Sequence, residues 1–188
     1  MMNSEARKFS KEELERLLAL LNEELEKEGI TGEICIVGGA SMVLAFGNRR
    51  STRDIDALLI HPSRIRNAVA RIAQEHSLPE DWLNDGAKGF ASQLPVESKD
   101  VLHFSNLRVI TPPADYILAM KCVAARVGLD ENDKEDAKFL IRHLGLCNRE
   151  LVLETVAKYY QAQRIPAKTQ YFIEEIWNEL FPKSQDRF

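Results

Sequence analysis

The sequence predicts an α/β or α+β fold, with a small sheet before residue 111 and a helical C-terminal half. Two observations carry this prediction. Short apolar runs of the kind that form strands occur only before residue 111. Apolar residues at helical spacing fill the rest of the chain. We therefore expect residues 1–110 to form a sheet core with an N-terminal helix, and residues 111–188 to pack on it in a single compact unit.

Each element is predicted from local signals. Ser10-Lys11-Glu12-Glu13 is a capping box, and the leucines that follow at helical spacing predict a helix that ends at Gly29. Ser105-Asn106 separates two apolar runs and predicts a tight hairpin, and Asn148 is placed to cap a helix. The other expected elements are strands at 34–37, 54–60, 101–104 and 107–110, a polar loop at 78–86, and helices at 40–46, 63–76, 111–126, 133–144, 148–160 and 169–180.

The composition predicts a folded cytoplasmic protein without a membrane span. Hydrophobic residues make up 45% of the 188 residues and charged residues 29%, which supplies enough apolar material for a packed core. A formal net charge of −4 gives no indication of nucleic-acid binding through overall charge, and it leaves a local basic patch open. No apolar run is as long as a membrane span. Cys35, Cys122 and Cys147 lack ligand or disulfide spacing, so we interpret them as buried thiols.

A glycine pair, Gly38-Gly39, ends the apolar run at 34–37 and precedes a predicted helix. Without side chains, such a turn lets a phosphate approach the backbone amides at the start of the helix. Ser41 would add a hydroxyl group to this phosphate site. The alternative is structural, because a tight turn between a strand and a helix also uses glycine, and serine is common near the start of a helix.

Asp54 and Asp56 alternate along the next apolar run. Residues i and i+2 of a strand point to the same face, so the two carboxylates would converge while Ile55 is buried on the other side. Aspartate is depleted in strands, and converging carboxylates repel each other unless a cation lies between them. The pattern predicts a site for Mg²⁺ or Mn²⁺, held by these oxygens and by substrate phosphates. The alternative is an exposed edge, with Asp54 at the start of the strand.

Four cationic side chains are candidates for phosphate neutralisation. Arg49, Arg50 and Arg53 surround the loop before the acidic pair, where a guanidinium suits a phosphate but a solvated basic loop is equally open. Lys121 lies on the apolar stripe of the helix expected at 111–126. Its ammonium group either reaches solvent along its apolar stem or enters a cleft to meet a triphosphate.

Two further aspartates, Asp133 and Asp136, are three residues apart and share one face of the next predicted helix. They either stabilise the start of this helix through its dipole or take part in the site. The four histidines are scattered without ligand spacing, so they predict no metal site.

Together these residues resemble the signature of polymerase-β-type nucleotidyltransferases, which is a glycine pair, a helix and an Asp-x-Asp strand. The chain is similar to the AbiEii-like and MenT-like branch and to its uncharacterised bacterial relatives, the DUF6036-like proteins. In that branch a helix with a lysine and then an Asp-x-x-Asp helix start follow the metal pair. The resemblance covers about residues 30–145. The matching segments are Val37-Gly38-Gly39-Ala40-Ser41, Arg50-Ser51-Thr52-Arg53-Asp54-Ile55-Asp56, Asp81-Trp82-Leu83-Asn84-Asp85, Ala119-Met120-Lys121 through Arg126, and Asp133-Lys134-Glu135-Asp136.

The resemblance implies a nucleotidyltransferase-like fold and a metal-dependent transfer of a nucleoside monophosphate from an NTP to an RNA acceptor, such as tRNA, or to a protein. Asp54 and Asp56 would hold the metal, and Lys121 would neutralise phosphate charge. Asp133 or Asp136 would position Lys121 or the nucleotide base, or act on the acceptor. In this branch such enzymes are often toxins of toxin–antitoxin or phage-defence systems, which implies an antitoxin partner. The residues that would bind the nucleotide are Gly38, Gly39, Ser41, Arg50, Ser51 and Arg53.

The chain departs from the family pattern in two places. Many members carry a third metal carboxylate on a later strand, whereas the strands expected at 101–104 and 107–110 contain no acid. Asp100 and Glu97 lie before them, and Asn132 stands where relatives often have a basic residue. A catalytically degenerate protein that binds a nucleotide or a partner is therefore an alternative. A structural interaction module that uses helices at 148–180 is a third.

Overall fold

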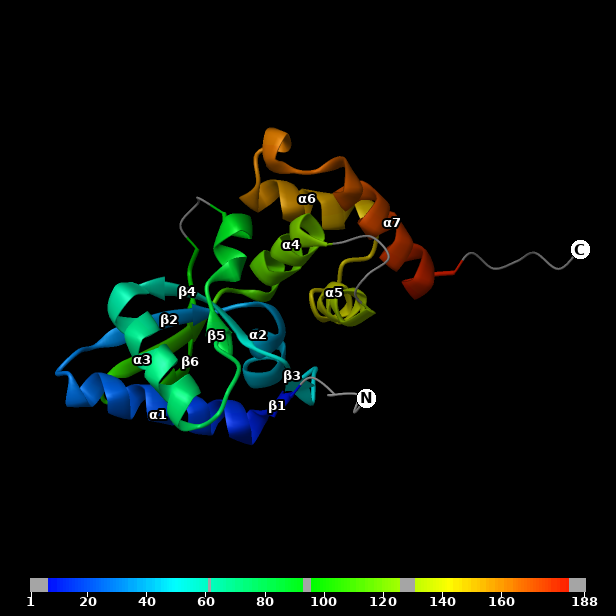
Figure 1. Ribbon diagram of the computed structural model, residues 1–188. Coiled ribbons are helices and arrows are strands. Elements are labelled where there is room, and N and C mark those ends of the chain that lie inside the picture. The colour runs from blue at the N-terminus through cyan, green and yellow to red at the C-terminus, as the bar shows by residue number, and fades with distance from the viewer. Residues whose placement is uncertain (1–6, 61, 93–95, 126–130, 183–188) are drawn as a thin grey trace, which may run out of the picture. The chain divides into compact units, whose positions relative to one another are not determined.

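The computed structural model describes residues 7–60, 62–92, 96–125 and 131–182 (Figure 1). The chain divides into two compact units. The sheet unit comprises residues 1–89 and 97–112, and the helical unit comprises residues 90–96 and 113–188. All described strands belong to the sheet unit. The predicted fold class, a small mixed sheet flanked by helices with a helical C-terminal half, is confirmed.

A five-stranded mixed sheet forms the centre of the sheet unit, in the order β5-β4-β2-β7-β6. The middle strand, β2, pairs antiparallel with β4 and parallel with β7. β7 and β6 form the predicted antiparallel hairpin, and its register shifts between Asp100 and Leu102. The five strands are β2 (Gly32–Ile36), β4 (Ile55–Ile60), β5 (Leu83–Asn84), β6 (Lys99–His103) and β7 (Leu107–Thr111).

One face of this sheet is covered by α1 (Lys11–Lys27) and α3 (Pro62–Glu75), which lie side by side in Figure 1. α1 begins with the predicted capping box, because the Glu13 N–H donates to Ser10 Oγ and the Ser10 N–H donates to the Glu13 carboxylate. Alternate strand residues point to this face and meet the leucines of α1. The buried core formed in this way includes Leu14, Leu17, Leu18, Leu21, Leu25, Ile34, Ile36, Ile55 and Val109.

A second, two-stranded sheet joins the start of the described chain to the loop before the acidic pair. β1 (Phe9–Ser10) pairs antiparallel with β3 (Ser51–Thr52), so that Phe9 lies opposite Thr52. The sequence does not predict this sheet, because two-residue strands are too short to show periodicity. The same reason applies to β5, which forms within the loop expected at 78–86 and pairs parallel with the start of β4.

Two helices of the sheet unit begin earlier than the sequence predicts. α2 (Gly38–Leu44) contains both glycines in its first turn, rather than starting at residue 40, because Val37 already occupies the cap position. α3 begins at Pro62, whose fixed backbone angle suits the first turn of a helix. Ser63, where the helix is expected to begin, is therefore the second residue of α3.

In the helical unit, α4 packs against the other three α-helices. Pro113 occupies its cap position, so the helix begins after both prolines rather than at residue 111. The predicted cap of α6 is confirmed, since the Asn148 side chain accepts the N–H of Leu151 at 2.8 Å. The helices are α4 (Ala114–Ala124), α5 (Glu131–His143), α6 (Arg149–Tyr159) and α7 (Ala167–Leu180).

Residues 90–92 belong to the helical unit because two tyrosines bind their backbone. The Ser92 N–H donates to the Tyr116 hydroxyl at 2.9 Å, and the Tyr160 hydroxyl donates to the Phe90 carbonyl at 2.6 Å. The sheet unit and the helical unit therefore divide within η1 (Gly86–Phe90), between its residues Gly89 and Phe90.

None of the described helices is long and apolar enough to cross a membrane. Among the cysteines, Cys122 is buried as predicted and Cys35 is partly buried, but Cys147 is exposed. The prediction is wrong for Cys147 because this residue lies in the turn between α5 and α6, directly before the cap residue Asn148. Burial raises the pKa of the Cys122 thiol to about 12, so this thiol stays protonated at neutral pH.

Candidate functional site

The turn between β2 and α2 brings the backbone of Gly38 against the carboxylate of Asp56. Gly38 has a φ of +57°, a conformation that favours glycine. A Cβ atom on Gly38 would lie 2.9 Å from Asp56 Oδ2, closer than ordinary contact. The N–H of Val37, directly before the turn, donates to the backbone oxygen of Asp56 at 2.9 Å. Glycine is therefore required here both for the backbone conformation and for the close approach of a predicted metal ligand.

Gly39 makes room for a different neighbour, the second strand of the small sheet. A Cβ atom on Gly39 would lie 2.3 Å from Thr52 Oγ1 and 2.9 Å from Arg49 Nη1. Thr52 is buried and is held by its pairing with Phe9. The missing side chain at Gly39 thus lets the basic loop cross the start of α2, and the guanidinium group of Arg49 lies beside the turn.

Asp54 and Asp56 flank the buried Ile55 at the start of β4, and Asn84 of β5 is their common neighbour. Asn84 lies opposite Asp56 in the parallel register of the two strands, and its Nδ2 donates to Asp54 Oδ2 at 3.1 Å. Asp54 lies in the bend directly before β4, so the alternation of β4 applies to Asp56 alone, which points to the face opposite that of Ile55. Asp56 therefore lies against the Gly38 turn, and Asn84, the residue opposite it, binds Asp54.

Burial raises the pKa of Asp54 above its ordinary value. The hydrogen bond from Asn84 lowers this pKa, the negative charge of Asp81 raises it, and the charges of Arg53 and Arg49 lower it. Because the net shift is upward, the neighbouring protein groups do not fully compensate the ionised carboxylate. A divalent cation beside Asp54 would supply the missing compensation, since an opposite charge lowers the pKa of a carboxyl group.

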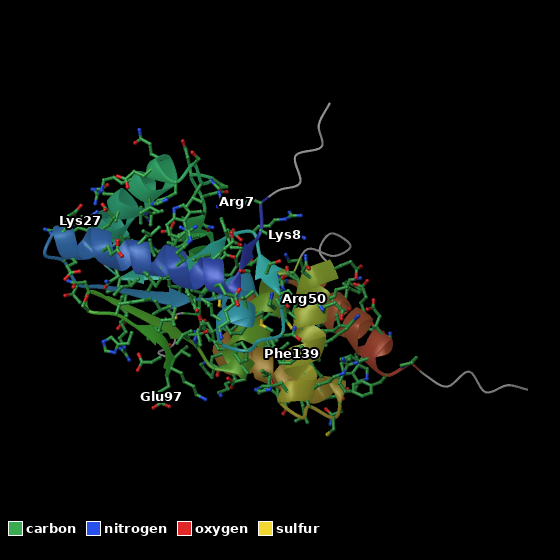
Figure 2. The ribbon with its side chains drawn as sticks, turned by 90° about the horizontal axis from the view of Figure 1, so that it is seen from below. Arg7, Lys8, Lys27, Arg50, Glu97 and Phe139 are labelled. Carbon is green, nitrogen blue, oxygen red and sulfur yellow. The ribbon has the colours of Figure 1, made fainter. Side chains whose placement is uncertain are left out.

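Arg50 and Arg53 are exposed, and they flank β3, the strand that pairs with β1. Arg7 and Lys8 directly precede β1, whose partner β3 lies between Arg50 and Arg53 in the sequence. Figure 2 shows Arg7 and Lys8 next to each other at the start of α1. We call these four residues the basic corner. Ser51, the other residue predicted to bind the nucleotide in this segment, is half-buried in β3.

The hydroxyl group of Ser41, which the sequence assigns to a phosphate site, binds the protein backbone. The side chain is fully buried, and its hydroxyl group donates to the Gly38 carbonyl at 2.8 Å. The turn itself uses this proton, so the structure does not support the prediction that Ser41 offers its hydroxyl group to a phosphate. Ser41 instead stabilises the conformation that Gly38 adopts.

The acidic pair fits a hard cation in part. Carboxylate oxygens suit Mg²⁺ and Mn²⁺, but no three His, Cys, Asp or Glu side chains of the described residues form a group that could hold a metal ion. The third carboxylate that many relatives carry on a later strand is absent from the end of β7, the neighbour of β2. This strand ends at Thr111, whose hydroxyl group donates to the Ile36 carbonyl at 3.1 Å. Asp100 on β6 accepts a hydrogen bond from Arg108 Nε at 2.6 Å. A cation at the acidic pair would therefore need substrate oxygens to complete its ligands.

In the helical unit, Lys121 forms an ion triad with two aspartates of α5. Its Nζ lies 2.7 Å from Asp133 Oδ1 and 2.7 Å from Asp136 Oδ2. The Lys121 side chain is 6% exposed and that of Asp136 is 1% exposed, so the ammonium group does not reach solvent along its stem. The two aspartates hold Lys121, and its role toward phosphate stays a prediction. Arg126 lies outside the described residues.

Two neighbours of the site are absent from the residues predicted to form it. Asn84 is 30 positions from Asp54 in the sequence, and only the pairing of β5 with β4 joins them. Thr52 contacts the turn because β3 pairs with β1. The signal that could have indicated Asn84 is the resemblance of the segment 81–85 to nucleotidyltransferase relatives.

The family of the chain is shown by comparison with family models. A model described as "Nucleotidyltransferase of unknown function (DUF6036)" matches residues 12–163, which include the acidic pair and the ion triad. The chain belongs to the DUF6036 family. No curated protein and no solved structure matches this DUF6036 chain. The family supports nucleotidyl transfer as the general class of activity and a nucleotide as a substrate, whereas the AbiEii-like and MenT-like branch stays a prediction.

Proposed function

We propose that this DUF6036 protein transfers a nucleoside monophosphate from an NTP to an acceptor, in a reaction that depends on Mg²⁺ or Mn²⁺. The observation that carries this proposal is the close approach of Asp56 to the Gly38 turn, with Asp54 hydrogen-bonded to Asn84, the residue opposite Asp56. Backbone N–H groups at a turn of this kind suit a phosphate. Paired carboxylates suit the cation that accompanies a triphosphate. The family match supports the same class of reaction.

The residues of the site would divide the work as follows. Asp54 and Asp56 would hold the cation, which when bound stabilises negative charge on the phosphates. Asn84 orients Asp54 by donating a hydrogen bond to the Oδ2 atom of Asp54. Gly38 leaves room for Asp56 and for an approaching phosphate. Arg53 adds positive charge beside the acidic pair.

In this proposal, the two aspartates of the ion triad position the ammonium group of Lys121. Asp133 and Asp136 fix the Nζ of Lys121 from two sides. The resemblance implies that Lys121 neutralises phosphate charge. Because two carboxylates face one ammonium group, a phosphate would have to compete with Asp133, the more exposed of the two, whose side chain is 36% exposed.

We further propose RNA as the acceptor. The basic corner gathers Arg7, Lys8, Arg50 and Arg53 on a chain whose net charge is −4, so this positive charge is local. The corner includes the loop that leads directly into the acidic pair. A polyanionic backbone is attracted to such a patch, and more strongly at low salt. A protein acceptor is the other outcome that the test below distinguishes.

The test is transfer of labelled nucleotide from each NTP in turn, with Mg²⁺, to total cellular RNA and to cellular protein. The wild type should label RNA, and the variant with Asp54→Ala and Asp56→Ala should label nothing. Asp100→Ala is the matched control, because this aspartate lies in the same sheet but binds Arg108. Equal labelling by the wild type and the double variant would contradict the enzymatic proposal, and labelling of protein alone would contradict the RNA acceptor.

A second candidate function is nucleotide or partner binding without catalysis. The observation that favours this candidate is that β7 ends at Thr111, which has no carboxylate, whereas many relatives carry a third metal carboxylate on a later strand. Calorimetry with non-hydrolysable NTP analogues separates the two candidates. Tight binding without transfer under any condition supports the degenerate protein, and metal-dependent transfer excludes it.

We also propose, from the resemblance, that the transfer activity is the toxin of a toxin–antitoxin or phage-defence system with an antitoxin partner. Induced expression in a bacterial host should arrest growth, and the variant with Asp54→Ala and Asp56→Ala should not. Co-expression of the neighbouring gene should restore growth. Normal growth with an active enzyme would refute the toxin role and leave the transferase proposal standing.

A further inference from the structure

A pocket at the outer edge of the five-stranded sheet shares Asn84 with the candidate site, and its other lining residues lie outside that site. Its volume is about 310 Å³, and β4, β5, α3 and the loop before β5 surround it. Leu59, Val69 and Leu83 form its apolar wall, and Ala70 lines its exposed side. Sites for small molecules typically measure about 300–1,000 Å³. This pocket is at the low end of that range, so it suits one side chain better than a nucleotide.

The outer edge of β4 is open beside this pocket. β4 extends over Ile55–Ile60, but β5 pairs only with Ile55 and Asp56. In the part of the chain that the structure describes, residues 57–60 pair with β2 alone, on the inner side. Ile60 is 44% exposed at the end of this edge. An open edge presents backbone N–H and C=O groups that another strand can bind.

The rim of the pocket is acidic. Glu80, Asp81 and Asp85 line it with one cation, Arg66, and Arg66 is already bound to Asp85. Glu80 and Asp81 are exposed and form no ion pair with any other described residue. The rim therefore repels phosphate groups and attracts lysine or arginine side chains.

We propose that this edge pocket binds an extended, basic segment of a partner protein, which adds a strand to β4. Side chains of a strand alternate in direction, so every second side chain of the added strand would point to the face where Leu59 lines the pocket. One apolar side chain would fill the pocket, and basic residues on either side would meet Glu80 and Asp81. In strand addition, main-chain hydrogen bonds provide affinity and such pockets provide specificity.

The chain contains a natural reporter for this pocket. Trp82 lies between the rim residue Asp81 and the wall residue Leu83 in the sequence. Its side chain is fully buried, and its Nε1 donates to the Val69 carbonyl at 3.1 Å. The chain has two tryptophans, and the other, Trp177, lies in the helical unit. Trp177→Phe therefore leaves a protein whose indole fluorescence reports on the pocket alone.

The experiment titrates this full-length variant with three synthetic peptides in the absence of nucleotide. The first is acetyl-Lys-Lys-Val-Leu-Val-Lys-Lys-amide, the second has glutamate in place of every lysine, and the third has proline in place of both valines. The first should give a saturable change in Trp82 fluorescence. The acidic peptide should bind with an affinity at least about tenfold lower, because two ion pairs at the rim are lost. The proline peptide should fail to bind, because it cannot form the backbone ladder.

Variants of the protein then locate the binding. Ala70→Phe should abolish the signal by filling the pocket, and Asn67→Phe, an exposed residue of the same helix outside the pocket, should not. Glu80→Lys should weaken the basic peptide and strengthen the acidic one, which a merely unfolded variant would not do. Equal binding of the basic and acidic peptides, no saturable binding up to millimolar peptide, or unchanged binding by Ala70→Phe would overturn the proposal. None of these outcomes depends on transferase activity.

Discussion

Substitution of Gly38 by alanine tests whether the close approach of Asp56 matters for metal binding. The substitution has two separable effects. It places an ordinary side chain at a φ of +57°, and it places a Cβ atom 2.9 Å from Asp56 Oδ2. Gly47 provides the matched control, because its φ is +64° and nothing lies within 4 Å of a Cβ atom there. Gly47→Ala therefore has the first effect without the second.

The expected magnitudes follow from these geometries. A left-handed backbone costs an alanine about 1–2 kcal/mol, so both variants should lose about that much free energy of unfolding. Ordinary contact begins at 3.4 Å, so in Gly38→Ala the Asp56 oxygen must retreat by about 0.5 Å, more than the roughly 0.2 Å that a metal ligand tolerates. We therefore expect Gly38→Ala to bind Mn²⁺ about ten- to a hundredfold more weakly, and Gly47→Ala to bind it as the wild type does.

Urea unfolding measures the first quantity, and calorimetric titration with Mn²⁺ and a non-hydrolysable NTP analogue measures the second. The comparison is decisive because both variants carry the same kind of backbone strain. If Gly38→Ala loses stability like Gly47→Ala but keeps the Mn²⁺ affinity of the wild type, Asp56 is not held against the turn as a metal ligand. A loss of Mn²⁺ affinity in Gly47→Ala would show that strain alone accounts for the effect.

Three further substitutions test separate parts of the structure. Lys121→Met should lower the free energy of unfolding by about 3–5 kcal/mol in urea titration, because buried Asp136 loses the ammonium group 2.7 Å from its Oδ2 atom; adding Asp136→Leu should restore much of this loss, and no restoration would contradict the buried ion pair. Asp54→Asn should raise the melting temperature at neutral pH without metal, because the raised pKa of Asp54 makes its ionised form a cost to the fold; this gain should vanish as pH falls below the unfolded pKa near 3.8, and a gain that persists there would refute it. Asn148→Ala should cost about 1 kcal/mol in the same urea titration through loss of the α6 cap, and an unchanged midpoint would mean that this cap contributes nothing.

Elements that depend on neighbouring residues in the sequence could be predicted. The capping box at Ser10 and Glu13, the cap at Asn148 and the hairpin around residues 105–106 each depend on residues within three or four positions, and the structure contains all of them. The two-residue strands could not be predicted, because β1, β3 and β5 exist only through their pairing with distant segments. The start of α2 at Gly38 is a boundary set by the backbone rather than by composition.

The candidate site shows the same division. Alternation within one strand predicts that Asp54 and Asp56 share a face, but β4 begins at Ile55, so Asp54 lies in the bend before the strand. Asn84 joins them only because β5 pairs with β4 in one register, which no local pattern specifies. For Lys121 the residues alone leave two environments open, solvent and a cleft, whereas the resemblance implies that Asp133 or Asp136 positions it. The packing of α4 on α5 gives an ion pair with both aspartates.

The contacts of the two glycines set a minimum number of residues between the glycine pair and the acidic pair. Gly38 accommodates Asp56, and Gly39 accommodates Thr52, which precedes Asp56 by four residues. The loop after α2 must therefore be long enough to return across Gly39 as β3 before the chain enters β4 beside Gly38. A shorter loop would let Asp56 reach the turn only by giving up the pairing of Thr52 with Phe9. One turn without side chains thus joins the basic loop and the acidic strand, and this joint contact makes the two motifs a single site.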